Sequence, residues 1–106
     1  MGWMEVGAAE EFPLGSGREI VVGGQIVAVF HAEDGFWAVD GMCAHQGGPL
    51  AQGKLDGHCV TCPWHGWQYD VRSGKHLLTG RPMLTVYRVE NRAGRLWIEV
   101  PETVEG

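Results

Sequence analysis

Two cysteines and two histidines, arranged as two short motifs, are the residues of this chain best suited to chemistry. The motif Cys43-x-His45 is separated by sixteen residues from Cys62-x-x-His65. Thiolate sulfur and neutral imidazole nitrogen both bind transition metals. Structural zinc sites more often pair like with like, as two nearby cysteines followed by two nearby histidines. Because each motif here contains one ligand of each kind, the pattern favours two metal ions, one bound by both sulfurs and the other by both nitrogens.

The segments around these motifs resemble those of a known protein family. The stretches "CAHQGGPL" (43–50) and "CPWHGWQYD" (62–70) are similar to the ligand loops of Rieske proteins. In a Rieske [2Fe–2S] centre, two histidines replace two cysteines on one of the two irons. The flanking β segments and a later loop, "TGRP" (79–82), extend the resemblance over most of the chain.

The resemblance implies one Rieske-type [2Fe–2S] cluster held by both motifs. Cys43 and Cys62 would bind the buried iron, and His45 and His65 the outer one. Two ferric ions, two sulfides and two thiolates sum to zero charge when the histidines are neutral, whereas four thiolates would leave a charge of −2. The neutral centre accepts an electron more easily, so Rieske potentials lie at about −150 to +300 mV. A structural zinc-binding module is the alternative use of the same four residues.

The resemblance also gives roles to residues beside the ligands. Glycines in both loops would let backbone N–H groups approach the cluster sulfides without interference from a Cβ atom. A tyrosine would direct its hydroxyl at the sulfur of a cluster cysteine, and apolar side chains would keep water from the iron. The residues at these positions are Gly47, Gly48, Trp64, Gly66, Tyr69 and Pro82.

Departures from the family pattern indicate a particular type of centre. High-potential Rieske proteins join their two loops by a disulfide, and the corresponding positions here are Gly48 and Trp64. Those proteins also carry a serine that hydrogen-bonds a bridging sulfide, where this chain has Trp67. Tyr69 retains one donor that would raise the potential. We therefore expect the low-potential centre of a soluble, oxygenase-associated ferredoxin.

The rest of the chain predicts the framework that must position these loops. Short runs of β-branched and aromatic residues alternate with turns, and Gly23-Gly24 is a typical two-residue hairpin turn. Strands are predicted within residues 4–6, 18–31, 36–40, 83–90 and 95–100. The expected fold class is all-β: the Rieske fold, a small antiparallel framework, sandwich-like or barrel-like, with an inserted loop-rich subdomain that binds the cluster.

The length favours a single domain over residues 1–106, with the insert at approximately 41–82. Within the insert only "WQYDV" predicts a strand, and apolar residues are few. Burial alone is not expected to hold such a segment in shape. The bound cofactor is therefore expected to organise it.

Charge and cysteine content exclude several classes of protein. The net charge is −5, and the basic residues are dispersed, which argues against a nucleic-acid-binding surface. The longest apolar run, residues 26–30, is far shorter than a membrane span, and no signal-peptide pattern is seen at the N-terminus. An odd number of cysteines, 3, argues against a disulfide framework. These observations predict a cytoplasmic protein that binds neither membranes nor nucleic acid.

The remaining cysteine and histidines are not expected to act in the site. Cys59 matches no ligand position and is expected to be a reduced, partly buried thiol. His31 is expected at a strand end, and His58 and His76 in surface loops.

The resemblance implies a function for the whole chain. In a chain of this length a second domain for a mononuclear iron is not expected, and the sequence contains no nucleophile elbow or nucleotide fingerprint. The expected function is therefore that of a monomeric one-electron carrier, not an enzyme, between a flavin-dependent reductase and a terminal oxygenase or similar acceptor. The alternatives are the small Rieske subunit of a larger reductase, such as a nitrite reductase, and a redox sensor.

Overall fold

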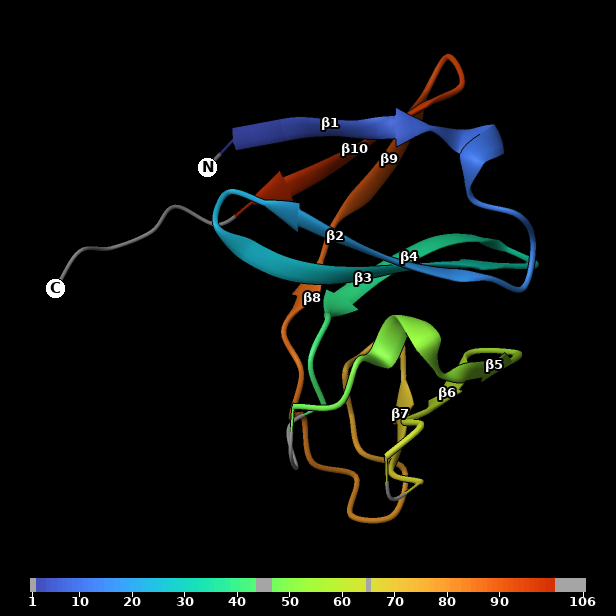
Figure 1. Ribbon diagram of the computed structural model, residues 1–106, viewed down its shortest axis with the longest axis vertical. Helices are drawn as coiled ribbons and strands as arrows, with labels where there is room; N and C mark the ends of the chain where they lie inside the picture. The colour runs from blue at the N-terminus through green and yellow to red at the C-terminus, as the bar shows by residue number, and fades with distance from the viewer. Residues whose placement is uncertain (1, 44–46, 65, 101–106) are drawn as a thin grey trace, which may run out of the picture.

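The computed structural model describes residues 2–43, 47–64 and 66–100 (Figure 1). Among these residues the structure contains strands and two short 3-10 turns, and no α-helix. The strands are β1 (Gly2–Ala8), β2 (Gly17–Val22), β3 (Gln25–Ala32), β4 (Gly35–Asp40), β5 (Lys54–Asp56), β6 (Cys59–Thr61), β7 (Gln68–Asp70), β8 (Val86–Tyr87), β9 (Val89–Arg92) and β10 (Arg95–Val100), and the 3-10 turns are η1 (Ala9–Glu11) and η2 (Leu50–Gln52). The all-β class predicted from the sequence is confirmed.

The strands form three antiparallel sheets, in the orders β1-β10-β9, β2-β3-β4-β8 and β5-β6-β7. The predicted hairpin is formed by β2 and β3, with Val22 opposite Gln25. Gly23 and Gly24 have φ angles of +58° and +79°. A two-residue turn with both φ angles positive matches the right-handed twist of the strands it joins, and glycine adopts it without a steric penalty.

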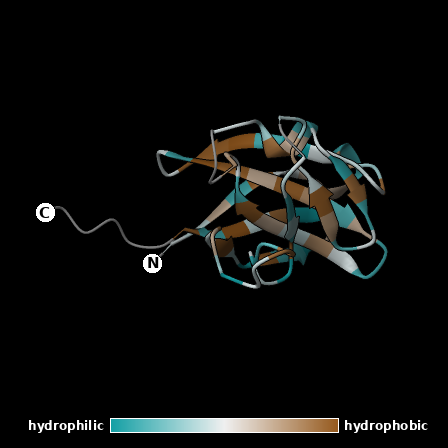
Figure 2. Cartoon of the chain, turned by 90° about the horizontal axis from the view of Figure 1, so that it is seen from below, coloured by the Kyte–Doolittle hydropathy of each residue, from teal (hydrophilic) through white to brown (hydrophobic). Residues whose placement is uncertain are grey.

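The β2-β3-β4-β8 sheet is the middle of three layers and is buried on both faces (Figure 1). On β3, Val27 and Val29 pack toward the β1-β10-β9 sheet, whereas Ala28 and Phe30 pack toward the β5–β7 segment. The continuous apolar run of this strand follows from that position, because side chains on both faces must be apolar. In Figure 2 the apolar segments concentrate on the strands.

The C-terminal strands differ in one respect from the expectation. The predicted alternation in β10 is confirmed, with Leu96 and Ile98 fully buried. The single strand predicted over residues 83–90 is instead divided, since β8 joins the middle sheet and β9 the outer sheet. Asp40 at the end of β4 holds the β8 segment to the middle sheet, because its carboxylate accepts hydrogen bonds from the Thr85 N–H (2.8 Å) and the Tyr87 hydroxyl (2.9 Å). Burial raises the pKa of Tyr87 to about 12, and the hydrogen bond to Asp40 adds to the rise. The hydroxyl therefore remains a donor.

The segment at 41–82 is better packed than the sequence predicted. Besides the expected strand at β7, it forms two further three-residue strands, β5 and β6, which the sequence did not predict. Leu50, Val60, Tyr69 and Val71 are fully buried in one cluster with Phe30 of the middle sheet. Apolar burial therefore anchors the insert on the framework, in addition to any contribution from a cofactor.

Candidate metal centre

Cys43 and Cys62 both lie in short loops that follow a strand, Cys43 after a strand of the framework and Cys62 after a strand of the insert. Cys43 follows β4 and is 4% exposed, and Cys62 follows β6 and is 1% exposed. The backbone N–H of Cys43 donates to the Gly48 carbonyl (2.8 Å), and that of Cys62 donates to the Trp67 carbonyl (2.7 Å). Each loop is therefore closed by a hydrogen bond at its own cysteine.

The two thiol groups lie next to one another. Burial raises the pKa of the Cys62 thiol, and the neighbouring Cys43 adds to the rise, while the backbone of Trp64 opposes it. Two converging, buried sulfurs form a soft donor pair of the kind an iron or zinc ion requires, and a metal displaces their protons. The described half of the motif set therefore fits the thiolate-bound iron of a [2Fe–2S] cluster. His45 and His65 lie outside the described residues.

Tyr69 lies beside Cys43 in the same buried cluster. It is fully buried, and its hydroxyl lies 3.1 Å from the Cys43 Sγ atom. A metal-bound thiolate has no proton, so in the loaded protein the hydroxyl would be the donor of this hydrogen bond. The tyrosine thus lies where the resemblance required a donor to a cysteine sulfur.

Gly48 is required by close packing between the two loops. A Cβ atom on this residue would lie 2.8 Å from the Cys62 Sγ atom and 3.2 Å from the Trp64 Cβ atom. Positions 48 and 64 are therefore adjacent, as expected of positions that hold a disulfide in the high-potential relatives. In this chain the absence of a side chain at Gly48 leaves room for the Cys62 sulfur.

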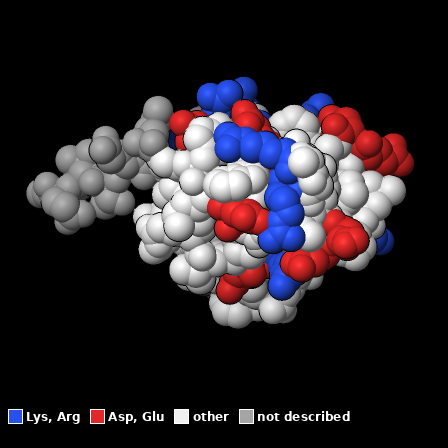
Figure 3. All heavy atoms as spheres, turned by 90° about the horizontal axis from the view of Figure 1, so that it is seen from above, with Lys and Arg blue, Asp and Glu red and all other residues white. Residues whose placement is uncertain are grey.

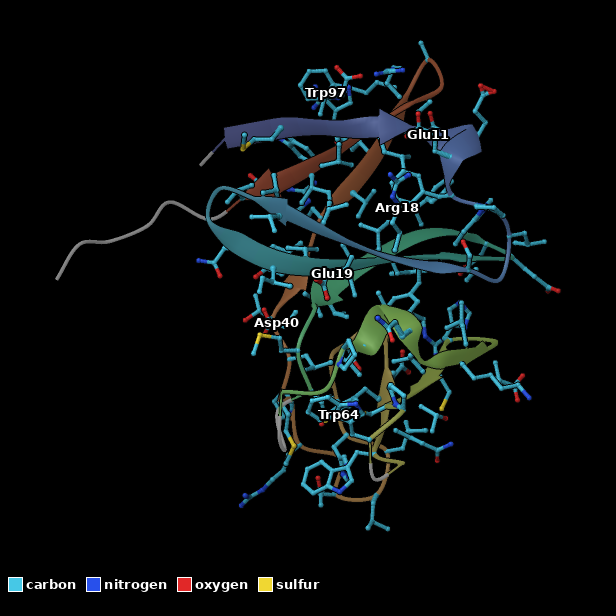
Figure 4. All side chains as sticks on the ribbon, in the orientation of Figure 1. Glu11, Arg18, Glu19, Asp40, Trp64 and Trp97 are labelled. Atoms are coloured by element: carbon cyan, nitrogen blue, oxygen red, sulfur yellow. The ribbon has the colours of Figure 1, made fainter. Side chains whose placement is uncertain are left out.

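The other residues expected beside the ligands differ in backbone conformation and in exposure to solvent. Gly47 and Gly66 have positive φ angles of 72° and 75°, and the Gly47 N–H donates to the Cys43 carbonyl (2.8 Å). Trp64 is half-exposed, at 49%, and lies at the insert end of the molecule (Figure 4). Pro82 is exposed. Trp64 and Pro82, two side chains expected to keep water from the iron, are therefore open to solvent.

Three expectations outside the motifs have definite outcomes. Cys59 is a partly buried free thiol, as predicted, and burial raises its pKa with help from Asp56 and Asp70. His58 lies in the β5–β6 turn and its Nε2 is 2.9 Å from the Asp34 carboxylate. The prediction for His76 was wrong: this residue is buried, at 6% exposure, although the polar loop around it gave no sign of burial.

None of the helical segments that the structure describes has the length and apolar character needed to cross a membrane.

Comparison with known proteins gives a consistent result. The Rieske [2Fe-2S] domain family matches residues 2–88. Ferredoxin CarAc of Metapseudomonas resinovorans is 32% identical over 98 residues, which are 91% of this chain and 92% of that ferredoxin. Cholesterol 7-desaturase nvd of Hemicentrotus pulcherrimus is 38% identical over 76 residues, but this chain spans only 16% of its length.

Solved structures share the fold. One chain in the complex of reduced oxygenase and oxidized ferredoxin in carbazole 1,9a-dioxygenase superposes with a TM-score of 0.85 at 30% identity, covering 97% of both chains. A putative NADH-dependent nitrite reductase small subunit from Mycobacterium tuberculosis superposes with a TM-score of 0.86 at 22% identity, covering 95% of this chain and 97% of that one. At this lower identity the likeness shows the fold alone.

Proposed function

Because the chain belongs to the Rieske [2Fe-2S] domain family, we propose that it is a one-electron carrier between a flavin-dependent reductase and a terminal oxygenase. Its cofactor is one Rieske-type [2Fe–2S] cluster, which takes up and releases a single electron when bound. The observation that carries the proposal is the match to a ferredoxin over nearly the full length of both chains. The chain acts as a component of a redox system and is not itself an enzyme.

The proposed ligands are the four residues of the two motifs. Cys43 and Cys62 would hold one iron and His45 and His65 the other. The supporting observation is that the two cysteines are buried, adjacent, and held by loops closed at their own backbone N–H groups. Tyr69 would donate its hydroxyl to the Cys43 sulfur and so favour the reduced state.

The two ends of the molecule differ in a way that suits a carrier. At the insert end, Leu78 is 89% exposed and Trp64, Met42 and Leu77 are each about half exposed. The opposite face, over the β1-β10-β9 sheet, carries Lys or Arg interleaved with Asp or Glu (Figure 3). Exposed apolar side chains on the segment that carries the ligand motifs fit brief docking with a redox partner.

A free carrier is favoured over a permanent reductase subunit. The ferredoxin match has 32% identity over 91% of this chain and 92% of that ferredoxin, whereas the nitrite reductase small subunit shares the fold at 22% identity. We further propose a monomer made of one domain and located in the cytoplasm. Neither Cys59 nor Cys62 forms a disulfide, which suits a reducing compartment.

The test combines cofactor analysis with electron delivery. Purified protein should contain two irons and two sulfides per chain, and after dithionite reduction should give a rhombic EPR signal with a lower average g value than all-cysteine clusters. Reduced protein should be reoxidised on mixing with the oxygenase of carbazole 1,9a-dioxygenase, chosen as a related acceptor. A colourless, zinc-loaded protein would contradict the cofactor. Purification in a fixed complex with a large subunit would favour the reductase alternative.

A further inference from the structure

His76 is the one buried polar residue, besides cysteine and tyrosine, in the part of the chain that the structure describes. It lies in the segment that follows β7 and pairs across an isolated antiparallel bridge with Tyr69. Its backbone N–H donates to the Arg81 carbonyl (2.8 Å), and its carbonyl accepts from the Gly80 N–H (2.7 Å). The residue is therefore fixed at the base of a closed turn over residues 76–81.

The imidazole ring of His76 is held in one orientation by Thr79. Its Nδ1 atom lies 3.3 Å from the backbone nitrogen of Thr79 and 3.3 Å from the Thr79 hydroxyl oxygen. A backbone N–H can only donate, so Nδ1 is the acceptor of this hydrogen bond. The two contacts with Thr79 therefore fix the orientation of the His76 ring.

The ring packs between two aromatic residues, each of which contacts one of the two buried cysteines. The Trp67 ring centroid lies 4.6 Å away and the Tyr69 centroid 5.5 Å away, the latter edge-on at 70°. The Tyr69 hydroxyl reaches the Cys43 sulfur, and the Trp67 carbonyl accepts the Cys62 N–H. Through Tyr69, His76 is thus one residue away from the Cys43 sulfur, and through Trp67 it is one residue away from the backbone of Cys62.

From this arrangement we propose that His76 is a positioning residue that holds the Tyr69 hydroxyl against the Cys43 sulfur and thereby raises the reduction potential of the cluster. The inference rests on the proposed cluster ligands. Side chains in a protein interior are closely packed, so removing the His76 ring would leave a cavity beside Tyr69 that the neighbouring residues fill only partly. Without the imidazole the Tyr69 ring gains freedom, its hydroxyl donates less well to the thiolate, and the reduced state loses stabilisation.

The test is a double-mutant cycle read out by the midpoint potential. His76→Ala should lower the potential, and Tyr69→Phe should lower it by at least as much. If His76 acts through Tyr69, the double variant should have the potential of Tyr69→Phe alone. His58→Ala, the same change at a partly exposed histidine of the insert, is the matched control and should leave the potential unchanged.

A second variant separates the ring from mere stability. His76→Phe keeps an aromatic ring between Trp67 and Tyr69 but removes the acceptor for Thr79, so it should restore most of the potential lost in His76→Ala even if it unfolds earlier. An unchanged potential in His76→Ala, additive shifts in the double variant, or a fall in His76→Phe as large as in His76→Ala would each overturn the proposal. Failure of the proposed function is distinguishable, because the wild-type protein would then show no reducible two-iron signal at all.

Discussion

The β framework and the 41–82 insert of this chain are held together by different means. In the framework, long strands bury alternating apolar side chains, and the middle sheet is covered on both faces. In the insert, the strands are only three residues long, and loops and turns make up most of the remaining residues. Two buried cysteines lie in these loops. The framework is therefore specified by apolar pattern, whereas the insert depends on a few individual contacts.

Because of this difference, substitutions in the framework and in the insert should affect different properties of the protein. A loss of apolar volume in the framework should weaken the whole fold, because its residues share one large cluster between two sheets. A change at a single insert residue should instead alter the cofactor site, while the sheets of the framework remain paired.

The largest effect is expected from removing a cluster cysteine. Cys62→Ala should abolish the visible colour and the bound iron, because the thiolate-bound iron loses one of its two sulfurs. The framework should still give a far-UV circular dichroism spectrum of paired strands. Cys59→Ser, at the partly buried free thiol, is the matched control and should keep the full iron content. Loss of iron in the Cys59 variant would show that the ligand cysteines are wrongly assigned.

A core truncation in the framework should produce the opposite result. Ile98 is fully buried between the two framework sheets, so Ile98→Ala should lower the free energy of unfolding by about 2–5 kcal/mol. The visible spectrum and midpoint potential of the folded fraction should not change. Ile98 belongs to a different group of buried hydrophobic residues from the one that contains Cys43 and Cys62. Denaturant titration measures the first quantity and redox titration the second. A shifted potential would mean that the two regions are coupled.

The same contrast explains what the sequence could predict. The hairpin at Gly23-Gly24 and the alternation of Leu96 and Ile98 were predicted because they follow from repeating patterns. The division of β8 from β9 was not predicted, because β8 pairs with β4 and is held by Asp40, which is more than forty residues distant along the chain. Long-range contacts of this kind leave no periodic signal in the local sequence.

Within the site, the motifs identified the candidate ligands and Tyr69, but they did not identify His76, which packs against Tyr69 and Trp67. His76 lies in a polar loop with no apolar period, and its burial arises only when that loop folds back against Trp67 and Tyr69. The close approach of Gly48 to Cys62 likewise became visible only in three dimensions. Local patterns therefore predict which residue types are present in the insert, while the contacts between its loops require the structure.

An intermediate effect is expected at that close approach. Gly48→Ala would place a methyl group 2.8 Å from the Cys62 sulfur, so one loop must shift and the cluster should be held less firmly. We expect lower iron content and faster loss of colour in a chelator, with a smaller change in the folding of the framework. Gly2→Ala, where a Cβ would meet nothing within 4 Å, is the control. Equal iron retention in both variants would show that the loops adapt without cost.

The smallest effect is expected where the framework and the insert are joined at the surface. The Asp34 carboxylate, between β3 and β4, accepts hydrogen bonds from the Trp37 indole (3.0 Å) and from His58 of the β5–β6 turn (2.9 Å). The Trp37 hydrogen bond, followed by that of His58, holds the pKa of this exposed carboxyl below its usual value. A carboxyl whose pKa is lowered on folding contributes stability above its unfolded pKa of about 3.9.

That contribution is lost as the pH falls through the lower pKa of the folded state. Asp34→Asn should therefore lower the melting temperature slightly at pH 7, and the difference from wild type should shrink once the pH is below 4. Glu33→Gln, at the exposed neighbouring acid, is the control for the change in net charge. A pH-independent difference would mean that the carboxylate charge is not what joins the two regions, and that the packing of Trp37 against His58 joins them instead.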